Sequence, residues 1–370
     1  MKKTRIIIYS AGAILYAVIF ACLFEFSRRT AYVWSFLEED SGIGRIVSGD
    51  TKMILTGFAL GLIPGIITVL LAARVRAYWT LRLRTRTVRI SALVVMLIVN
   101  ALALLYLGSD VFISSRRYLS EREQIDNIRN MLAREQRIYH AGGGVTGPDG
   151  IVYNYTNSRE AFQQSLDRDE KFVELDFRFT TDGELVCIHN WKKDFVKPDG
   201  TLAEGQVSLE EFLQGKIQGH FTPMTVEEVA GAMREHPDLH IVVDLKGDDV
   251  IEGYRVLAQK YPDLMPRLIP QFYHAVQFDY LYGLGYRAMI FTLYRTSEWE
   301  RSEASLNSFA MRQMLVGITM GTYRIDDGGT FLRQVLKTRQ PVYIHTVDDP
   351  ARQQELFDMG VSAVYTNVLA

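Results

Sequence analysis

Residues 174–189 read Glu174-Leu-Asp176-Phe-Arg-Phe-Thr-Thr-Asp-Gly-Glu-Leu-Val-Cys-Ile-His189 and predict a β-hairpin. Asp-Gly is a strong hairpin-turn dipeptide, because the turn needs residues that tolerate a positive φ. Side chains two residues apart on a strand point to the same face, so the carboxylates of Glu174 and Asp176 lie together. The apolar run after the turn leads back to His189. Two carboxylates and an imidazole suit metal-assisted attack on a phosphate ester, and a half-buried hairpin with two solvated acids is the alternative.

Two other segments place polar side chains after short apolar runs. His140 follows one such run and precedes Ala141 and three glycines, whose backbone N–H groups can approach a ligand closely and form an anion-binding concavity. Asp244 and Lys246 end the run that begins at His240, and they share one strand face. Three separate strand ends therefore offer carboxylates, imidazoles and an ammonium group.

Together these segments resemble the glycerophosphodiester phosphodiesterase family, within the wider group of phosphatidylinositol-phospholipase-C-like barrels. Members of that family carry a His-Arg-Gly opening, a Pro-Glu-Asn-Thr segment, a Glu-Leu-Asp strand, an Ile-His-Asp strand end and a Glu-x-Lys strand. Here residues 174–189 match the central block, and residues 244–246 stand for Glu-x-Lys with Asp in place of Glu. Residues 155–158 occupy the Pro-Glu-Asn-Thr place, and residues 360–367 match the closing segment. The resemblance covers residues 137–370.

The chain also departs from the family pattern at several positions. Ala141 replaces the arginine that follows the first histidine, so the usual guanidinium contact to phosphate is missing or has moved. Three cations are candidates to replace it: Arg178, Lys192 and Lys246. Thr156 replaces the family glutamate, and Asn190 replaces the acid after the second histidine. The Asp-x-Lys at Asp244 is similar to that of the sphingomyelinase D enzymes, which also lack the arginine.

The expected chemistry is metal-assisted cleavage of a phosphodiester. A divalent cation, Ca²⁺ or Mg²⁺, would be held by three carboxylates: Glu174, Asp176 and Asp244. The resemblance implies that a neighbouring hydroxyl of the substrate attacks phosphorus and gives a cyclic phosphate. His140 and His189 would then act as general base and general acid, in an order that the sequence leaves open. Lys246 would neutralise charge on the phosphate.

Two alternatives remain beside a phosphodiesterase that acts outside the cytoplasm on glycerophosphodiesters or phospholipid-derived diesters. One is a lyase similar to sphingomyelinase D, which stops at the cyclic phosphate. The other is a catalytically inactive barrel that binds lipid headgroups. The departures at positions 141, 156 and 190 favour the inactive barrel, whereas the retained histidines, carboxylates and lysine oppose it. The sequence specifies neither the headgroup nor the oligomeric state.

From residue 137 onward, apolar β runs alternate with helical patterns. The β units are expected at 136–140, 172–178 with 185–189, 240–246, 267–272, 286–291, 314–319, 341–346 and 361–366. Helices are expected between them, at 158–168, 225–235, 248–260 and 349–359 among others. Eight β units separated by helices predict an α/β fold, a (β/α)8 TIM barrel, whose functional groups gather at the C-terminal strand ends. Residues 190–224 exceed an ordinary connection and are expected to cap the site.

The overall composition hides a membrane-like N-terminal third. The chain has 370 residues, 48% of them hydrophobic, and a net charge of −2. Residues 6–24, 53–73 and 90–108 are each apolar over about the ~20 residues that a transmembrane helix needs. A signal peptide is the alternative for the first span, but no small-residue cleavage site follows it. We therefore expect residues 1–109 to form a three-helix membrane anchor, residues 110–136 a helical linker and residues 137–370 the barrel.

Charge predicts the orientation of this anchor. The loop between the second and third spans contains six arginines and no acid: Arg74, Arg76, Arg82, Arg84, Arg86 and Arg89. The positive-inside rule places this loop and the N-terminus in the cytoplasm, and three crossings then put residues 110–370 outside the cytoplasm. The flanking spans make orientation and contact with anionic lipid a better explanation of these arginines than nucleic-acid binding.

The remaining polar and sulfur-containing residues carry weaker signals. His240 precedes the third strand and is expected on the surface, and His345 is a candidate to line the pocket. His274 is a minor candidate for substrate contact. Cys22 and Cys187 fall in different parts of the chain and predict no disulfide. In the linker, apolar residues at helical spacing predict an amphipathic helix that packs on the barrel or, as a minor alternative, lies on a membrane.

Overall fold

The computed structural model describes residues 122–247, 250–325 and 328–368. The three predicted membrane spans, 6–24, 53–73 and 90–108, lie outside these described residues. Within the described ranges, no helix combines the length and apolarity that crossing a membrane requires. The membrane anchor and its orientation therefore stay predictions from the sequence.

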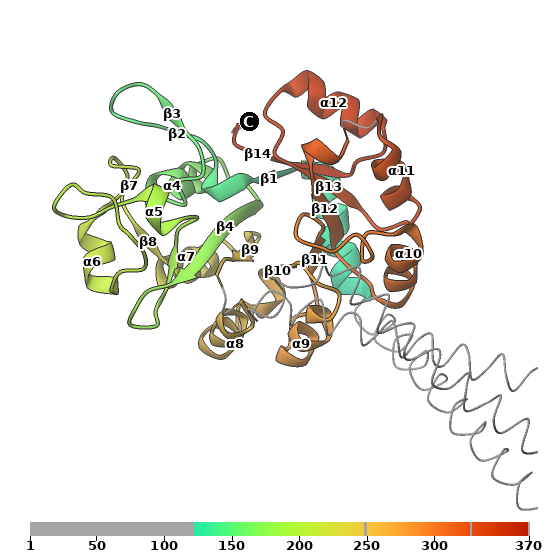
Figure 1. Cartoon of the computed structure of the whole chain (residues 1–370), viewed down its shortest axis with the longest axis horizontal. Coiled ribbons are helices and arrows are strands. Elements are labelled where there is room, and N and C mark those ends of the chain that lie inside the picture. The colour runs from blue at the N-terminus through green and yellow to red at the C-terminus, as the bar shows by residue number, and fades with distance from the viewer. Residues whose placement is uncertain (1–121, 248–249, 326–327, 369–370) are drawn as a thin grey trace, which may run out of the picture. The chain divides into compact units, whose positions relative to one another are not determined.

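Eight parallel strands form a closed barrel (Figure 1). Each strand pairs in parallel with the next along the chain, and the first pairs with the last, which closes the ring. The strands are β1 (Arg137–Tyr139), β4 (Phe172–Phe179), β9 (His240–Leu245), β10 (Leu268–Phe272), β11 (Ile290–Thr292), β12 (Gly317–Gly321), β13 (Val342–His345) and β14 (Ala363–Thr366). Each predicted β unit overlaps one of them, so the TIM-barrel prediction is confirmed for the described residues.

Two of these strands begin three or four residues later than their apolar runs. β11 begins at Ile290 and β12 at Gly317, whereas the apolar runs begin at 286 and 314. The residues that precede the strands, such as Ala288 and Met314, pack instead in an apolar cluster at the N-terminal ends of the strands. These residues are therefore hydrophobic because they are buried in the core, although they do not pair in a strand.

The segment 174–189 forms the predicted hairpin beside the barrel. β4 pairs with β5 (Leu185–Cys187) in antiparallel register, and Gly183 supplies a positive φ of 84° in the turn. β5 in turn pairs with β8 (Met224–Thr225), also antiparallel. β5 is therefore not a barrel strand. It runs back from the C-terminal end of β4, so that Ile188 N–H donates to the carbonyl of Asp176 at 2.9 Å and His189 returns to the level of the carboxylates.

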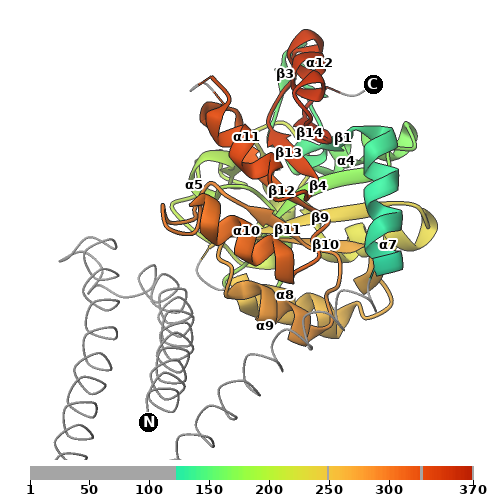
Figure 2. The same ribbon diagram turned by 90° about the vertical axis from the view of Figure 1, so that its right-hand side faces the viewer.

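Helices surround the strands (Figures 1 and 2). They are α4 (Arg159–Asp167), α7 (Val226–Glu235), α8 (Val250–Lys260), α9 (Gln277–Leu284), α10 (Glu303–Arg312), α11 (Thr330–Leu336) and α12 (Pro350–Asp358). Three of these helices begin at side chains that cap the helix N-terminus. Ser158 caps α4, Thr225 and Glu228 form a capping box on α7, and Asp349 caps α12 ahead of a proline. These caps fix the entry of each helix directly after a strand or loop.

A helix over residues 122–135 packs at the N-terminal ends of the strands. Its apolar face consists of Ile125, Ile128 and Leu132, each at most 3% exposed. These side chains join one cluster with residues from every barrel strand or its approach, including Phe172, Val242 and Tyr343. The described part of the linker therefore packs against the barrel, which was the first of the two alternatives for its amphipathic face.

The long segment after β5 has its own small core. It contains α5 (Trp191–Asp194), β6 (Phe195–Val196), α6 (Leu209–Gln214) and β7 (Lys216–Ile217). Trp191, Phe195 and Phe212 are buried against one another. The cluster also includes Val186 of β5 and Ala161 of α4, so this segment packs on the side of the barrel next to the hairpin.

Candidate active site

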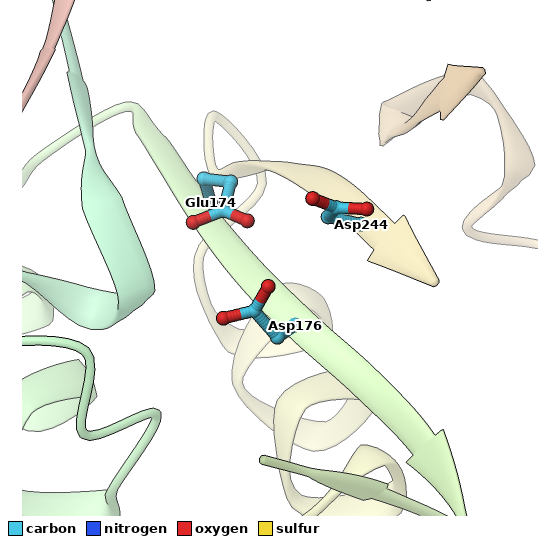
Figure 3. A group of neighbouring side chains, drawn as sticks. All are labelled: Glu174, Asp176 and Asp244. Carbon is cyan, nitrogen blue, oxygen red and sulfur yellow. The ribbon is translucent and has the colours of Figure 1, made fainter. Parts of the chain in front are cut away.

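Three buried carboxylates converge at the C-terminal side of β4 and β9. The strand register places Asp176 directly opposite Asp244, while Glu174 lies two residues earlier on the same face as Asp176. One oxygen from each carboxylate lies within 4.8 Å of the others (Figure 3). The three residues are between 1% and 4% exposed. The structure therefore brings together all three predicted metal ligands.

Lys246 lies against this carboxylate group. Its Nζ is 3.2 Å from Asp176 Oδ1, contacts Asp244 Oδ2 and donates to the hydroxyl of Tyr294 at 3.2 Å. Tyr273 donates a second hydrogen bond to Asp244 from the other side. One ammonium group against three carboxylates leaves two negative charges in a buried space, which is a large electrostatic cost unless a cation balances them.

The pKa shifts follow from this crowding of like charge. Burial raises the pKa of Glu174 well above its usual range, and the carboxylates of Asp176 and Asp244 raise it further. For Lys246, burial acts to lower the pKa, but the carboxylates of Asp244 and Asp176 outweigh it and hold the pKa well above the usual value. Burial would raise the pKa of Asp176, yet Lys246 and the histidines keep it low. Asp176 and Lys246 are therefore charged, and Glu174 is the carboxylate that most needs a further cation.

The donor set fits a hard divalent cation. Carboxylate oxygens are the ligands that Ca²⁺ and Mg²⁺ prefer, at roughly 2.0–2.6 Å, and water usually completes their coordination. Two residual negative charges also match the charge of one such ion. Three carboxylates suit both ions, so the donor set does not distinguish Ca²⁺ from Mg²⁺.

Asn157 fixes the carboxylate of Asp176. Its Nδ2 donates to Asp176 Oδ2 and its Oδ1 accepts from Asp176 N–H, both at 2.8 Å. Asn157 is fully buried and adopts a positive φ of 50°. It belongs to the segment 155–158, and the sequence assigned it no role of its own. The only local signal for such a role was the position of this asparagine, after a non-helical turn and directly before the residue that caps a helix.

His140 follows β1 and faces the carboxylates. The N–H of the next residue, Ala141, donates to Glu174 Oε2 at 2.9 Å, and His140 Nε2 is 3.8 Å from the same oxygen. His140 Nδ1 is 3.3 Å from Asn367 Oδ1, and Asn367 Nδ2 donates to Asp348 Oδ2 at 2.8 Å. The Asn367 oxygen can only accept, so Nδ1 carries the proton and Nε2 is left as an acceptor toward the site. Burial lowers the pKa of His140, which favours this neutral form.

His189 reaches the site from the returning strand of the hairpin. Its Nδ1 is 3.6 Å from Asp194 Oδ2, a buried oxygen that has no hydrogen-bond partner among the described residues. The ring of Tyr155 contacts both imidazoles, with centroid distances of 4.4 Å to His140 and 5.5 Å to His189. Both predicted histidines are therefore brought to one place, each beside an acidic or amide partner that the sequence analysis did not identify.

A pocket of about 410 Å³ opens above these groups. Its lining includes the two histidines, Glu174, Asp244 and Lys246, the candidate His345, and also Gln271 and Tyr294. Thr319 Oγ1 lies 3.1 Å from His345 Nδ1, and burial lowers the pKa of His345 to about 3, so it is a neutral polar group in the wall. The pocket is larger than a single phosphate group requires and falls in the usual range for small-molecule sites.

Two expectations about other residues are corrected, and one minor candidate falls outside the pocket lining. His240 is buried rather than exposed, because its ring stacks on Phe172 at 5.0 Å at the N-terminal end of the barrel. His274 does not line the pocket, since it pairs with buried Glu300 at 3.2 Å. The segment 190–224 does not cap the pocket. Of its residues only Asn190 lines it, because the apolar side chains of the segment turn inward to their own core.

Cations line the mouth of the pocket in place of the arginine expected after the first histidine. Ala141 is fully buried, so position 141 contributes a backbone N–H and no charge. Of the three candidates, Lys246 and Arg178 line the pocket, whereas Lys192 is exposed on α5 and does not. Arg295 also lines it and was missed. It follows β11 by three residues, and only its position after a strand end signalled a role.

Comparison with known proteins returned solved structures alone. No family model matches the chain, and no curated protein matches it. Among solved structures, a provisionally assigned glycerophosphoryl diester phosphodiesterase from Silicibacter pomeroyi has a TM-score of 0.49 at 14% identity, covering 63% of this chain and 89% of the other. A glycerophosphodiester phosphodiesterase from Parabacteroides distasonis has a TM-score of 0.47 at 17% identity, covering 63% and 93%.

A phosphodiesterase from Oleispira antarctica, solved with the product sn-glycerol-3-phosphate, has a TM-score of 0.45 at 17% identity and covers 63% of this chain and 92% of the other. The TM-scores lie below 0.5, so the fold and the site rest on the geometry described above. That geometry defines a (β/α)8 barrel with an acidic, cation-lined pocket at the C-terminal ends of its strands.

Proposed function

We propose that this protein is a membrane-anchored, metal-dependent phosphodiesterase that cleaves glycerophosphodiesters or phospholipid-derived diesters outside the cytoplasm. The observation that carries the proposal is the pocket floor, where oxygens of three buried carboxylates lie within 4.8 Å of one another, Lys246 contacts two of these carboxylates, and both histidines line the same pocket. Each of these groups has a defined use in phosphodiester cleavage, and the motif that supplies them in the sequence resembles the glycerophosphodiester phosphodiesterase family.

The carboxylates Glu174, Asp176 and Asp244 would hold the cation. When bound, a divalent cation supplies Lewis-acid stabilisation of negative charge on the phosphoryl oxygens. Asn157 keeps the Asp176 carboxylate oriented for this role through its two hydrogen bonds. Lys246 neutralises further charge on the phosphoryl group and, through Tyr294 and Tyr273, stays aligned with Asp244.

The two histidines divide the proton transfers. His140 has its proton on Nδ1, facing Asn367, so its Nε2 can accept a proton from the attacking hydroxyl as general base. His189 lies beside the carboxylate of Asp194, 3.6 Å from its Nδ1, and would donate a proton to the leaving alkoxide as general acid. The resemblance implies that the hydroxyl belongs to the substrate itself, so the first product would be a cyclic phosphate.

Product analysis tests this function. The full chain, solubilised in detergent, is given glycerophosphodiesters and phospholipids with and without EDTA, and products are followed by phosphorus NMR. A phosphomonoester that forms only with the cation is the expected result, and a cyclic phosphate that persists would assign the lyase instead. Absence of turnover on every diester, with binding retained, would make the barrel a headgroup-binding module.

The cellular placement is a separate part of the proposal. It is supported by the apolar spans 6–24, 53–73 and 90–108 and by the arginine-only loop between the last two. With the N-terminus in the cytoplasm, the pocket would face substrates on the outer side of the membrane.

A further inference from the structure

One arc of the pocket wall is built from neutral polar side chains. The carboxylates of the floor belong to β4 and β9, whereas Gln271, His345 and Tyr365 line the pocket from β10, β13 and β14. We call these three residues the neutral wall. Gln271 is 4% exposed and Tyr365 is 2% exposed. A buried polar atom without a hydrogen bond costs free energy, so the bonds within the neutral wall identify the atoms that a ligand would have to satisfy.

A chain of hydrogen bonds runs through the neutral wall. Gln271 Oε1 accepts from the hydroxyls of Tyr365 at 3.3 Å and of Thr292 at 3.1 Å. Because Tyr365 gives its one hydroxyl proton to that oxygen, its own oxygen accepts from Thr319, which is its other partner. The hydroxyl of Thr319 has then used its proton. It therefore accepts from His345 Nδ1, which lies 3.1 Å away.

Two nitrogen atoms of the neutral wall have no hydrogen-bond partner among the described residues. One is Gln271 Nε2, which is a donor. The other is His345 Nε2, which is an acceptor, because burial keeps the pKa of His345 low and the one ring proton lies on Nδ1. A hydroxyl group both donates and accepts, so it matches this pair. The oxygens of an ionised phosphodiester only accept, so they cannot satisfy His345 Nε2.

The neutral wall borders on His140, the proposed general base. Thr346 follows His345 directly, and its Oγ1 lies 3.4 Å from His140 Nδ1. The ring of Tyr365 contacts both imidazoles, with centroid distances of 6.5 Å to His140 and 5.9 Å to His345. In the proposed reaction the attacking hydroxyl lies at His140, and the leaving group lies toward His189 on the hairpin. The neutral wall is therefore next to the alcohol that attacks.

We propose that Gln271 and His345 form a subsite for a second hydroxyl of the attacking alcohol and select substrates that carry one. The inference rests on the proposed cleavage of a phosphodiester at the floor. Gln271 Nε2 donates to the oxygen of this hydroxyl, and His345 Nε2 accepts its proton. The selected class is phosphodiesters whose attacking alcohol keeps a further free hydroxyl. An acyl ester at that position removes the proton that His345 accepts, and a hydrogen at that position leaves both nitrogens unpaired.

Two diesters that differ by one hydroxyl test the subsite. The full chain in detergent is given the p-nitrophenyl diester of glycerol 1-phosphate or that of propane-1,2-diol 1-phosphate, and kcat/KM is measured for each. The two compounds share the attacking hydroxyl, the phosphate and the leaving group. We expect the glycerol diester to be preferred by about 10- to 100-fold, because the other compound leaves two buried nitrogens without a partner.

Two variants of His345 separate the atom in the pocket from the bond inside the wall. An asparagine amide reaches the position of Nδ1 and keeps the bond to Thr319, whereas a glutamine amide reaches the position of Nε2. His345→Asn should lower the preference by about 3- to 10-fold, which corresponds to one neutral hydrogen bond. His345→Gln should retain most of it. Gln271→Met keeps the length of the side chain, removes the amide and should act like His345→Asn.

Gln354→Met is the matched control for Gln271→Met. Gln354 is exposed on α12, where its Nε2 donates to Asp358 Oδ1 at 2.9 Å, and this variant should keep the wild-type preference. Equal loss of activity on both diesters in Gln271→Met and His345→Asn would overturn the subsite, because these residues would then act on the scissile phosphate or only support the wall. A wild type without preference, or an unchanged preference in both variants, would overturn it as well.

Failure of the proposed function has a different signature. If wild type turns over neither diester, equilibrium titration of both compounds replaces kinetics. Tighter binding of the glycerol compound that is lost in Gln271→Met would support the subsite on a non-catalytic barrel. Equal binding of the two compounds, or binding of neither, would overturn it.

Discussion

Glu174 and Asp176 are neighbours on one strand face but are held differently. The Asp176 carboxylate accepts a hydrogen bond from Asn157 Nδ2, its backbone N–H donates to Asn157 Oδ1, and it forms an ion pair with Lys246, whereas Glu174 accepts one backbone N–H, from Ala141. Without a cation, Glu174 is therefore the carboxylate whose charge costs most. Its raised pKa has this origin, in burial first and then in the nearby carboxylates.

Glu174→Gln should separate stability from metal binding. Removing one buried negative charge relieves repulsion, so in EDTA the variant should unfold at a temperature higher than wild type by about 2–4 °C, the shift expected for about 1 kcal/mol. Ca²⁺ or Mg²⁺ should raise the unfolding temperature of wild type by mass action and leave the variant nearly unchanged. Thermal unfolding followed by fluorescence measures both, with exposed Glu210→Gln as the control. An undiminished cation response in Glu174→Gln would remove Glu174 from the ligand set.

His140→Ala and His189→Ala should each cut turnover by at least ~100-fold while leaving cation affinity nearly unchanged. The leaving group should distinguish them. A diester of p-nitrophenol needs little protonation of its leaving group, so His189→Ala should lose much less activity on it than on a glycerol diester. His140→Ala should lose activity equally on both. The reverse pattern would exchange the two roles, and activity that survives both substitutions would mean another route of catalysis.

At the scale of elements, the hairpin positions residues of the candidate site, whereas the helix 122–135 packs apolar side chains against the barrel. The hairpin places both carboxylates and one histidine within a single local unit, because an antiparallel return brings His189 back beside Asp176. The helix contributes no site residue. It buries Ile125, Ile128 and Leu132 against residues from the strands, at the end of the barrel opposite the pocket.

Leu132→Ala should destabilise the barrel. Leu132 is 1% exposed, and a buried leucine truncated to alanine costs about 2–5 kcal/mol through lost transfer energy and the cavity that remains. The free energy of unfolding, from denaturant titration of the detergent-solubilised chain, measures it. Asn127→Ala, an exposed change on the same helix, should have little effect. Equal stability of the two variants would mean that the helix is only a connection to the preceding segment.

At the scale of the whole molecule, the orientation of the chain decides which pool of substrate the pocket meets. Alkaline phosphatase is active only outside the cytoplasm. A fusion after residue 115 should therefore be active, and a fusion near Arg82 should be inactive, because the arginine-only loop is expected inside. Protein amounts measured by immunoblot control for expression. The opposite activities would place the pocket in the cytoplasm and contradict the proposed location.

The sequence alone determined the barrel and most of the polar groups that lie on its floor. Strand periodicity, helix caps and an Asp-Gly turn are local properties, so the eight β units and the helices between them could be predicted, with errors of a few residues where apolar residues belong to the core rather than to a strand. The candidate residues Glu174 and Asp176, and likewise Asp244 and Lys246, could be placed together because two-residue spacing on a strand dictates which side chains share a face.

Only the tertiary structure decided what holds those residues in place. His140 depends on Asn367, which lies 227 residues further along the chain, and Asp348 orients that amide in turn. Arg295 joins the pocket by stacking on Tyr273, a residue of another loop. Closure of the ring brings such pairs together, and no local pattern encodes them. The segment 190–224 was predicted to be a cap because of its length. Its apolar residues instead pack in a separate core, because the burial of side chains depends on packing across the whole fold.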